Sequence, residues 1–243
     1  MNRAKIRVFV EDDLGAGEPL NLAGHAHYLT NVMRLQVDAE IAVFNGRDGE
    51  WTARLVEAGK RRVTAQCLTR TLEQSTPPDL WLLFAPIKKA RTDFIVEKAT
   101  EMGARRIQPV FTRFTNSERV RPEKLHAHCI EAAEQCGGVF VPELSDPAPL
   151  DKVLDHWPQD RKLMFCDETS ARMDTLDALR SAGGGKWAIL IGPEGGFAAD
   201  EAARLRDMAQ TVPVNLGPRI LRADTAAVAA MALWQVALGD WRV

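Results

Sequence analysis

The apolar residues follow one pattern in the first third of the chain and another in the rest. Glycine-bearing turns separate short alternating or apolar runs at 6–10, 40–44, 50–56 and 62–68, and one short helical pattern covers 25–34. Closely spaced short strands with turn signals between them are typical of a small β-barrel. We therefore predict an N-terminal β-barrel domain over residues 1–73.

A polar segment with consecutive prolines, EQSTPPD, follows this region and predicts a linker at 74–79. Beyond it, strand patterns alternate with helical patterns. Strands are expected at 80–85, 106–111, 162–166 and 187–191, and helices at 90–102, 122–136 and 174–181. A last helix is expected from Asp224 or Thr225, either of which is a good N-cap, to Leu238. The alternation predicts an α/β domain over 80–243 with a mostly parallel sheet.

Two apolar strands near the carboxyl end, WAILI and VPVN, each run into a glycine-bearing loop that precedes a helix. Such loops expose backbone groups to a ligand. The spacing matches neither phosphate-binding glycine motif, and the acidic residues Glu194, Asp200 and Glu201 disfavour a polyphosphate. The loops therefore favour a neutral or cationic nucleoside such as S-adenosylmethionine. On this chemistry alone, two ordinary tight turns remain an equal alternative.

The loop sequences IGPEGGF and LGPRILRADTA closely resemble the paired C-terminal motifs of the SPOUT-class methyltransferases that make N3-methyluridine in 16S ribosomal RNA. The resemblance extends upstream through PIKKARTDFIVEKATEMGARRIQPVFTRFT and EAAEQCGG, and weakly to HYLTNVMRL, so that it covers nearly the whole chain. The chain departs from the family at Asp224, where glutamate is usual, and at Gly138, where arginine is frequent.

The resemblance implies a fold, a cofactor and partners. The fold is a mostly parallel α/β sheet with a C-terminal trefoil knot, preceded by a small PUA-like β-barrel. The cofactor is S-adenosyl-L-methionine, the partner is 16S rRNA or the small ribosomal subunit, and the protein is a homodimer. The cofactor-binding residues expected from the two loops are Ile191, Gly192, Pro193, Glu194, Gly195, Gly196, Leu216, Gly217, Ile220 and Leu221.

Methylation at N3 of a uridine requires removal of the N3 proton, so a general base is expected. Glu194 and Asp224 are the candidates. The alternative role of Glu194 is a backbone hydrogen bond, and that of Asp224 is N-capping, which is the favoured role for this residue. Arg219 and Arg222 are candidates for stabilising the uracil oxyanion, with Arg91 a more distant one. Arg222 also suits a phosphate contact. Because N3 lies on the Watson–Crick edge, the target base has to be unpaired or extruded.

The formal net charge of −2 argues against a nucleic-acid partner, but the charge is unevenly distributed. Residues 76–130 hold ten Lys and Arg against six Asp and Glu, which suits a phosphate-binding surface. A solvated charged surface is the alternative. The expected RNA-binding residues are Arg3, Arg7, Arg34, Lys88, Lys89, Arg91, Lys98 and Arg113.

Other features narrow the class of protein. The four cysteines are scattered without a CxxC pair, which indicates a reduced chain, and no metal site is expected. No apolar run approaches the roughly 20 residues that span a bilayer, and the amino terminus is unlike a signal peptide, so we expect a cytoplasmic protein. Two other functions remain open, a non-catalytic RNA-binding module and a nucleotide-dependent enzyme acting on a small metabolite.

Overall fold

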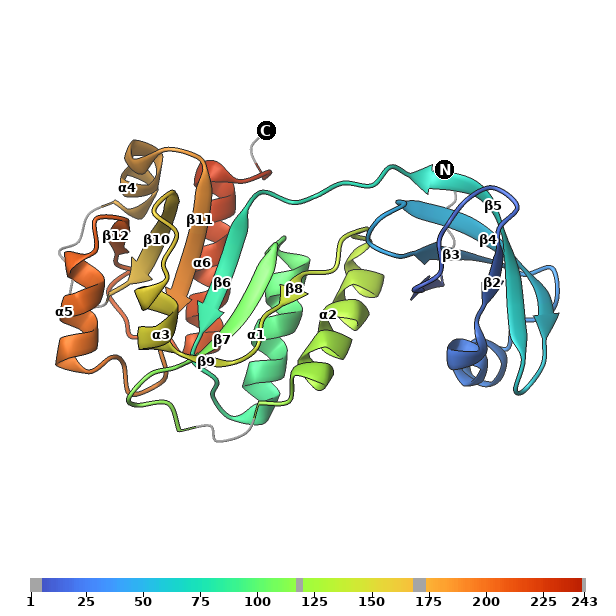
Figure 1. Cartoon of the computed structure of the whole chain (residues 1–243), viewed down its shortest axis with the longest axis horizontal. Coiled ribbons are helices and arrows are strands. Elements are labelled where there is room, and N and C mark those ends of the chain that lie inside the picture. Colours follow the sequence, from blue (N-terminus) through green and yellow to red (C-terminus); the bar gives the residue numbers. More distant parts are fainter. Residues whose placement is uncertain (1–5, 117–119, 168–173, 242–243) are drawn as a thin grey trace. The chain divides into compact units, whose positions relative to one another are not determined.

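The computed structural model describes residues 6–116, 120–167 and 174–241. The chain divides into two compact units, one formed by residues 1–76 with 133–141 and the other by 77–132 with 142–243 (Figure 1). The first change of unit falls inside the segment EQSTPPD. Nothing in the hydrophobic pattern indicated that residues 133–141 belong with the N-terminal unit, because this assignment depends on tertiary contacts.

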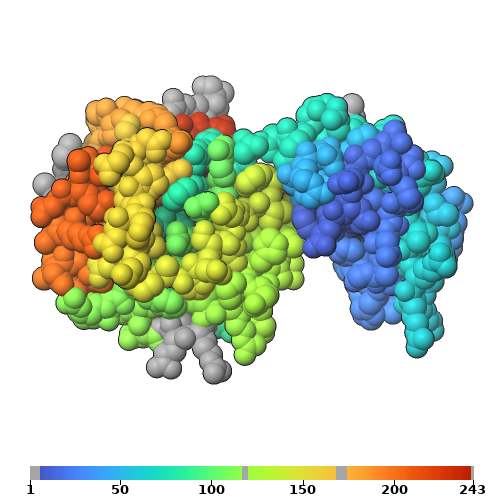
Figure 2. Space-filling view, viewed as in Figure 1, coloured from blue at the N-terminus to red at the C-terminus, as the bar shows by residue number. Residues whose placement is uncertain are grey.

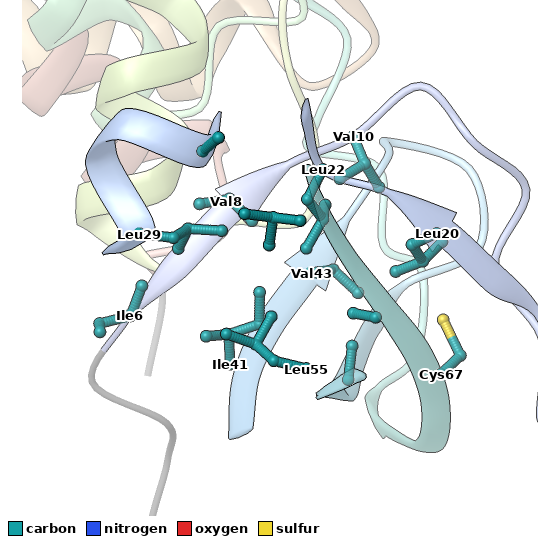
Figure 3. Packing of buried hydrophobic residues seen from close by; sticks show 14 of the residues in the cluster. Ile6, Val8, Val10, Leu20, Leu22, Leu29, Ile41, Val43, Leu55 and Cys67 are labelled. Atoms are coloured by element: carbon teal, nitrogen blue, oxygen red, sulfur yellow. The ribbon is translucent and has the colours of Figure 1, made fainter. Parts of the chain in front are cut away.

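The N-terminal unit is built on a mixed five-stranded sheet in the order β1-β3-β4-β5-β2. Its strands are β1 (Arg7–Phe9), β2 (Pro19–Asn21), β3 (Glu40–Phe44), β4 (Glu50–Ala58) and β5 (Val63–Leu72). Strands β1 and β3 pair in parallel, and the other pairs are antiparallel. Apolar side chains of all five strands meet in one core, which includes Val8, Leu20, Ile41, Leu55 and Cys67 (Figure 3).

Two details of this unit differ from the sequence-based expectation. The helical pattern at 25–34 forms a short 3-10 turn (Ala23–His25) followed by a π-helix (His27–Val32). Strand β2 was not predicted, because it has only three residues and begins with proline.

Arg7 is a structural residue of this unit, which corrects its assignment to RNA binding. Its side chain is 8% exposed, and its Nε donates to Glu50 Oε2 at 2.6 Å. The guanidinium also donates to the backbone carbonyls of Ala133, Glu134 and Gly138 at 2.7–2.9 Å. Arg7 therefore joins residues 133–141 to β1, and its donors do not face solvent.

We expect Arg7→Ala to destabilise the N-terminal unit by about 3–5 kcal/mol, because removing one member of a buried, hydrogen-bonded ion pair is costly. Native-state hydrogen exchange followed by mass spectrometry, read on peptides of β1, β3 and β4, measures the effect. Arg54→Ala is the matched control, since Arg54 pairs with Glu40 at an exposed position where such pairs contribute about 0–1 kcal/mol. Equal losses in the two variants would contradict the structural role of Arg7.

The second unit is an α/β domain whose sheet pairs are all parallel, which confirms the predicted class. The strand order is β12-β10-β11-β6-β7-β8, and β9 pairs with β7. The strands are β6 (Leu80–Phe84), β7 (Arg106–Phe111), β8 (Glu143–Leu144), β9 (Ala148–Pro149), β10 (Arg161–Cys166), β11 (Lys186–Ile191) and β12 (Thr211–Val214). The helices are α1 (Lys89–Glu101), α2 (Pro122–Cys136, of which residues 133–136 count with the first unit), α3 (Leu150–Asp155), α4 (Thr175–Ala182), α5 (Ala199–Asp207) and α6 (Ala223–Leu238).

Helices cover the sheet through apolar side chains. Leu150 and Leu154 of α3 and Leu205 of α5 pack in one cluster with strand residues such as Leu163 and Leu190. Arg204 of α5 also pairs with Asp151 and Asp155 of α3, and Figure 2 shows the two segments as neighbouring orange and yellow surfaces. Helices α1 and α6 contact each other, and the Gln235 side-chain amide donates to Met102 O at 2.6 Å.

Several boundaries in this unit follow from local chemistry. Gly103 has a φ of +77°, so it ends α1 in the left-handed conformation that glycine favours. Helix α6 begins earlier than expected: its N-cap is Arg222, without a side-chain cap, so the predicted caps Asp224 and Thr225 are wrong. The short elements α3, β8 and β9 were not predicted. The trefoil knot stays a prediction.

Candidate active site

The strand order brings the two glycine-bearing loops together. Strand β10 lies between β11 and β12, and because all three are parallel, their carboxyl ends meet at the same edge of the sheet. The loops there line a crevice of about 320 Å³ and an adjoining one of about 90 Å³, which share Cys166, Asp167, Ile220, Leu221 and Ala226. All the expected cofactor residues line these crevices: Ile191, Gly192, Pro193, Glu194, Gly195, Gly196, Leu216, Gly217, Ile220 and Leu221.

The first loop is shaped by an aromatic ring that covers a glycine. A Cβ added to Gly192 would lie 2.6 Å from the nearest ring atom of Phe197, so no larger residue fits without displacement. The Phe197 ring in turn meets Phe165 of β10 edge-on, with centroids 5.3 Å apart. Gly196 has a φ of +69°, and its N–H donates to Pro193 O at 2.9 Å. The loop is therefore a tight turn that presents its backbone toward the crevice.

Two of the three carboxylates noted beside this loop have structural roles. Glu201 is 7% exposed and accepts hydrogen bonds from the backbone N–H groups of Ala198 and Arg113, each at 2.9 Å. Asp200 accepts two hydrogen bonds from the Arg113 guanidinium, at 2.9 and 2.6 Å, and these lower the pKa of its carboxyl. Of the three carboxylates, Glu194 is the one that lines the crevice.

The second loop is held by Asn215. Its side-chain oxygen accepts from Gly217 N at 2.9 Å, and its carbonyl accepts from the Thr175 hydroxyl at 2.9 Å. Gly217 has a φ of +113°, which requires glycine. Ile220 follows with 85% of its surface exposed, although it lines both crevices. An apolar side chain is thus available to a ligand or partner at the rim.

Arg91, from the first turn of α1, lies between a carboxylate of the first loop and a carboxylate at the start of α6. Its Nη1 lies 3.4 Å from Glu194 Oε1, and its Nε lies 3.8 Å from Asp224 Oδ2. From the sequence, Arg91 was expected to bind RNA, and it was only a more distant candidate for stabilising the uracil oxyanion. The structure instead brings it between both candidate bases. This position could not be read from the sequence, because more than 100 residues separate Arg91 from either loop.

The other two arginine candidates are exposed. Arg219 lines the smaller crevice. Arg222 caps α6 with its backbone and forms no ion pair with any other residue that the structure describes. Their side chains are therefore available to a substrate.

Sequence reasoning missed the contribution of β10 to the crevice. Its end supplies Phe165, Cys166 and Asp167, and Arg206 of α5 also lines the crevice. Asp167 is 5% exposed and accepts from Arg206 Nε at 2.7 Å. The strand itself was predicted, but its place between β11 and β12 depends on strand order, which the pattern did not specify.

The expected RNA-binding residues fall into several groups. Arg3 lies outside the described residues. Lys98 pairs with Glu101 at 2.6 Å and stacks over Phe94, and Arg113 pairs with Asp200. Arg34, Lys88 and Lys89 are exposed and form no ion pair with the described part of the chain. These three suit a phosphate contact best.

The cysteines differ in their expected reactivity. Desolvation by burial raises the pKa of the Cys166 thiol to about 12 and that of Cys129 to about 11. Cys136 is exposed. Because the thiolate is the nucleophile, we expect iodoacetamide at pH 8 to label Cys136, which is exposed, and to leave Cys129, which is buried, unlabelled in the folded protein. Peptide mass mapping checks this, and denatured protein, in which all thiols react, is the control. Early labelling of Cys129 would contradict the burial argument.

Residues 6–116, 120–167 and 174–241 hold no group of three or more His, Cys, Asp and Glu side chains arranged to bind a metal ion. In the same ranges, no helix is long and apolar enough to cross a membrane.

Comparison with known proteins identifies the class. The profile of the RNA methyltransferase domain matches residues 74–235, and that of the RNA methyltransferase PUA domain matches 25–67. The chain therefore belongs to the RNA methyltransferase family. It is 30% identical to the ribosomal RNA small subunit methyltransferase E of Rickettsia conorii, over 93% of both chains.

Solved structures agree with this assignment. The ribosomal RNA small subunit methyltransferase E of Neisseria gonorrhoeae, bound to S-adenosylmethionine, superposes with a TM-score of 0.84 at 27% identity, covering 98% of this chain and 99% of that one. A methyltransferase of Legionella pneumophila in complex with the same cofactor also gives 0.84, at 28% identity, covering 97% and 98%.

Proposed function

We propose that this protein transfers the methyl group of S-adenosylmethionine to N3 of a uridine in the ribosomal RNA of the small subunit. The observation that carries the proposal is the convergence of both glycine-bearing loops on one crevice. Relatives of similar length are named for methylation of this RNA, and two similar structures contain this cofactor.

The crevice fits the cofactor in shape and chemistry. Gly192 lets the Phe197 ring pack against the loop where a side chain would collide with it, and the crevice is lined by apolar groups that suit a flat base, including Ile220 and Leu221. Glu194 supplies a negative charge that favours a sulfonium over a phosphate. When bound, S-adenosylmethionine supplies an electrophilic methyl group.

The side chains around Arg91 suit the uridine. As the N3 proton leaves, negative charge develops on the uracil ring, and a guanidinium beside it stabilises that charge. Glu194 and Asp224 are the carboxylates that could accept the proton, and Arg91 lies near both. Arg222 and Arg219 are exposed at the second loop. Their guanidinium groups stabilise the uracil oxyanion or bind an adjacent phosphate of the RNA.

The direct test is methyl transfer in vitro. Purified protein is incubated with S-adenosylmethionine labelled in the methyl group and with 16S rRNA or small subunits from cells that lack the protein. We expect one labelled nucleoside, identified as N3-methyluridine by chromatography and mass spectrometry. A labelled base other than uridine, or no transfer to either substrate, would contradict the proposal.

The proposal includes a homodimer that acts in the cytoplasm, where its substrate is assembled. Exposed apolar side chains support the dimer, among them Ile220 on the second loop and Val236 on α6, which is 46% exposed. Light scattering coupled to size exclusion tests it. Twice the chain mass of 26.9 kDa is expected, and a monomer at micromolar concentration would refute the dimer.

A further inference from the structure

A second hollow, also of about 320 Å³, lies beside the first turns of α1 and α2. Its floor is apolar: Ile87 and Leu125 are 4% and 3% exposed. The Thr92 hydroxyl exchanges two 3.0 Å hydrogen bonds with the backbone of Ile87, so this part of the floor is fixed. None of the residues that line the two crevices lines this hollow.

Three cations surround this floor. Lys89, Arg121 and Lys124 are exposed and line the hollow. None forms an ion pair with another residue in the described ranges, in contrast to Lys98 and Arg113. Cations without a carboxylate partner around an apolar floor match a ligand with a phosphate at one end and a flat apolar group at the other.

Asp93 indicates how such a ligand is oriented. Its carboxylate also lines the hollow, and its Oδ2 lies 3.7 Å from His128 Nε2. A carboxylate there repels a phosphate from its side of the hollow but accepts hydrogen bonds from the N–H groups of a base. The phosphate therefore belongs at the cationic rim and the base on the floor.

The first turn of α1 links this hollow to the active site. Lys89 lines the hollow, and Arg91 lies near Glu194 and Asp224. Two residues along a helix advance about 3 Å and turn by about 200°, so the two side chains leave opposite sides of the same turn of α1, and an RNA strand that reaches both has to pass around the start of this helix. We propose that the hollow binds a nucleotide of the RNA substrate near the target uridine, with its phosphate at Lys89, Arg121 and Lys124. This inference rests on the proposed function.

The test compares Arg121→Gln and Lys124→Gln with Lys152→Gln, which removes the same charge from an exposed lysine of α3 without an ion pair in the described chain. Methylation rates are measured against the concentration of small subunits between 50 and 200 mM salt. We expect each rim variant to raise KM about tenfold with kcat unchanged, and to reduce the slope of log KM against log salt by about 1. Lys152→Gln should match the parent protein.

The outcomes separate the inference from the proposed function. If the parent protein transfers no methyl group to ribosomal RNA, the proposed function fails. If the parent is active and the rim variants behave like Lys152→Gln, the inference is wrong. Calorimetry with inorganic phosphate tests whether the hollow binds a free anion and not the RNA. If the rim variants lose phosphate binding but keep the KM for the RNA of the parent protein, the inference is also wrong. Unchanged S-adenosylmethionine binding in each variant confirms that it is folded.

Discussion

Gly192→Ala should weaken S-adenosylmethionine binding by about 100-fold, which is about 2.7 kcal/mol. The added Cβ would lie 2.6 Å from the Phe197 ring, and because Phe197 packs on Phe165, the ring cannot yield without disturbing the crevice wall. Either the ring or the loop backbone must move, and both contribute to the crevice. Isothermal titration calorimetry measures the change in Kd.

Gly184→Ala is the matched control. A Cβ at Gly184 meets no atom within 4 Å, and its φ is not in the left-handed region, so we expect a Kd within about twofold of the parent. Because overpacking also destabilises proteins by about 1–3 kcal/mol, thermal unfolding should accompany the titration. A folded Gly192→Ala protein that binds the cofactor like the control would show that this loop does not hold it.

Arg91→Ala should lower kcat about 10²- to 10³-fold, the usual effect of removing one group that stabilises developing negative charge. Two carboxylates, Glu194 and Asp224, would also lose the cation between them. Single-turnover methylation at saturating RNA and cofactor measures this rate. Arg91→Lys should recover part of it, because the charge remains but the planar fork of donors is lost.

Arg180→Ala provides the comparison for Arg91. Arg180 is exposed on α4 and pairs with Asp177 at 4.0 Å, outside both crevices. Its removal should leave kcat unchanged. If Arg91→Ala instead raised only the RNA concentration required and kept the single-turnover rate, Arg91 would be an RNA contact, as its sequence context indicated, and its electrostatic role would be wrong.

The sequence predicted the α/β class well because local patterns determine it. Buried parallel strands such as β11 are continuous apolar runs, and α1 ends within one residue of the predicted boundary at 102. The predicted cofactor residues also meet in space, since each loop directly follows a strand of one parallel sheet.

The errors share a physical cause, which is tertiary contact between distant segments. Arg7 looked like an exposed cation, yet three carbonyls of residues 133–138 and Glu50 bind it. Arg91 looked remote, yet the fold brings α1 to both loops. Asp200 and Glu201 looked like anions of the site, yet the segment after β7 binds both. Composition and periodicity hold no information about such pairings.

A crystal structure of the protein grown with S-adenosylmethionine shows whether the two loops hold this cofactor through their main chain. We expect cofactor density between Gly192–Gly196 and Leu216–Leu221, with hydrogen bonds from the backbone of both loops. Cofactor bound elsewhere on the protein while this crevice stays empty would contradict this expectation.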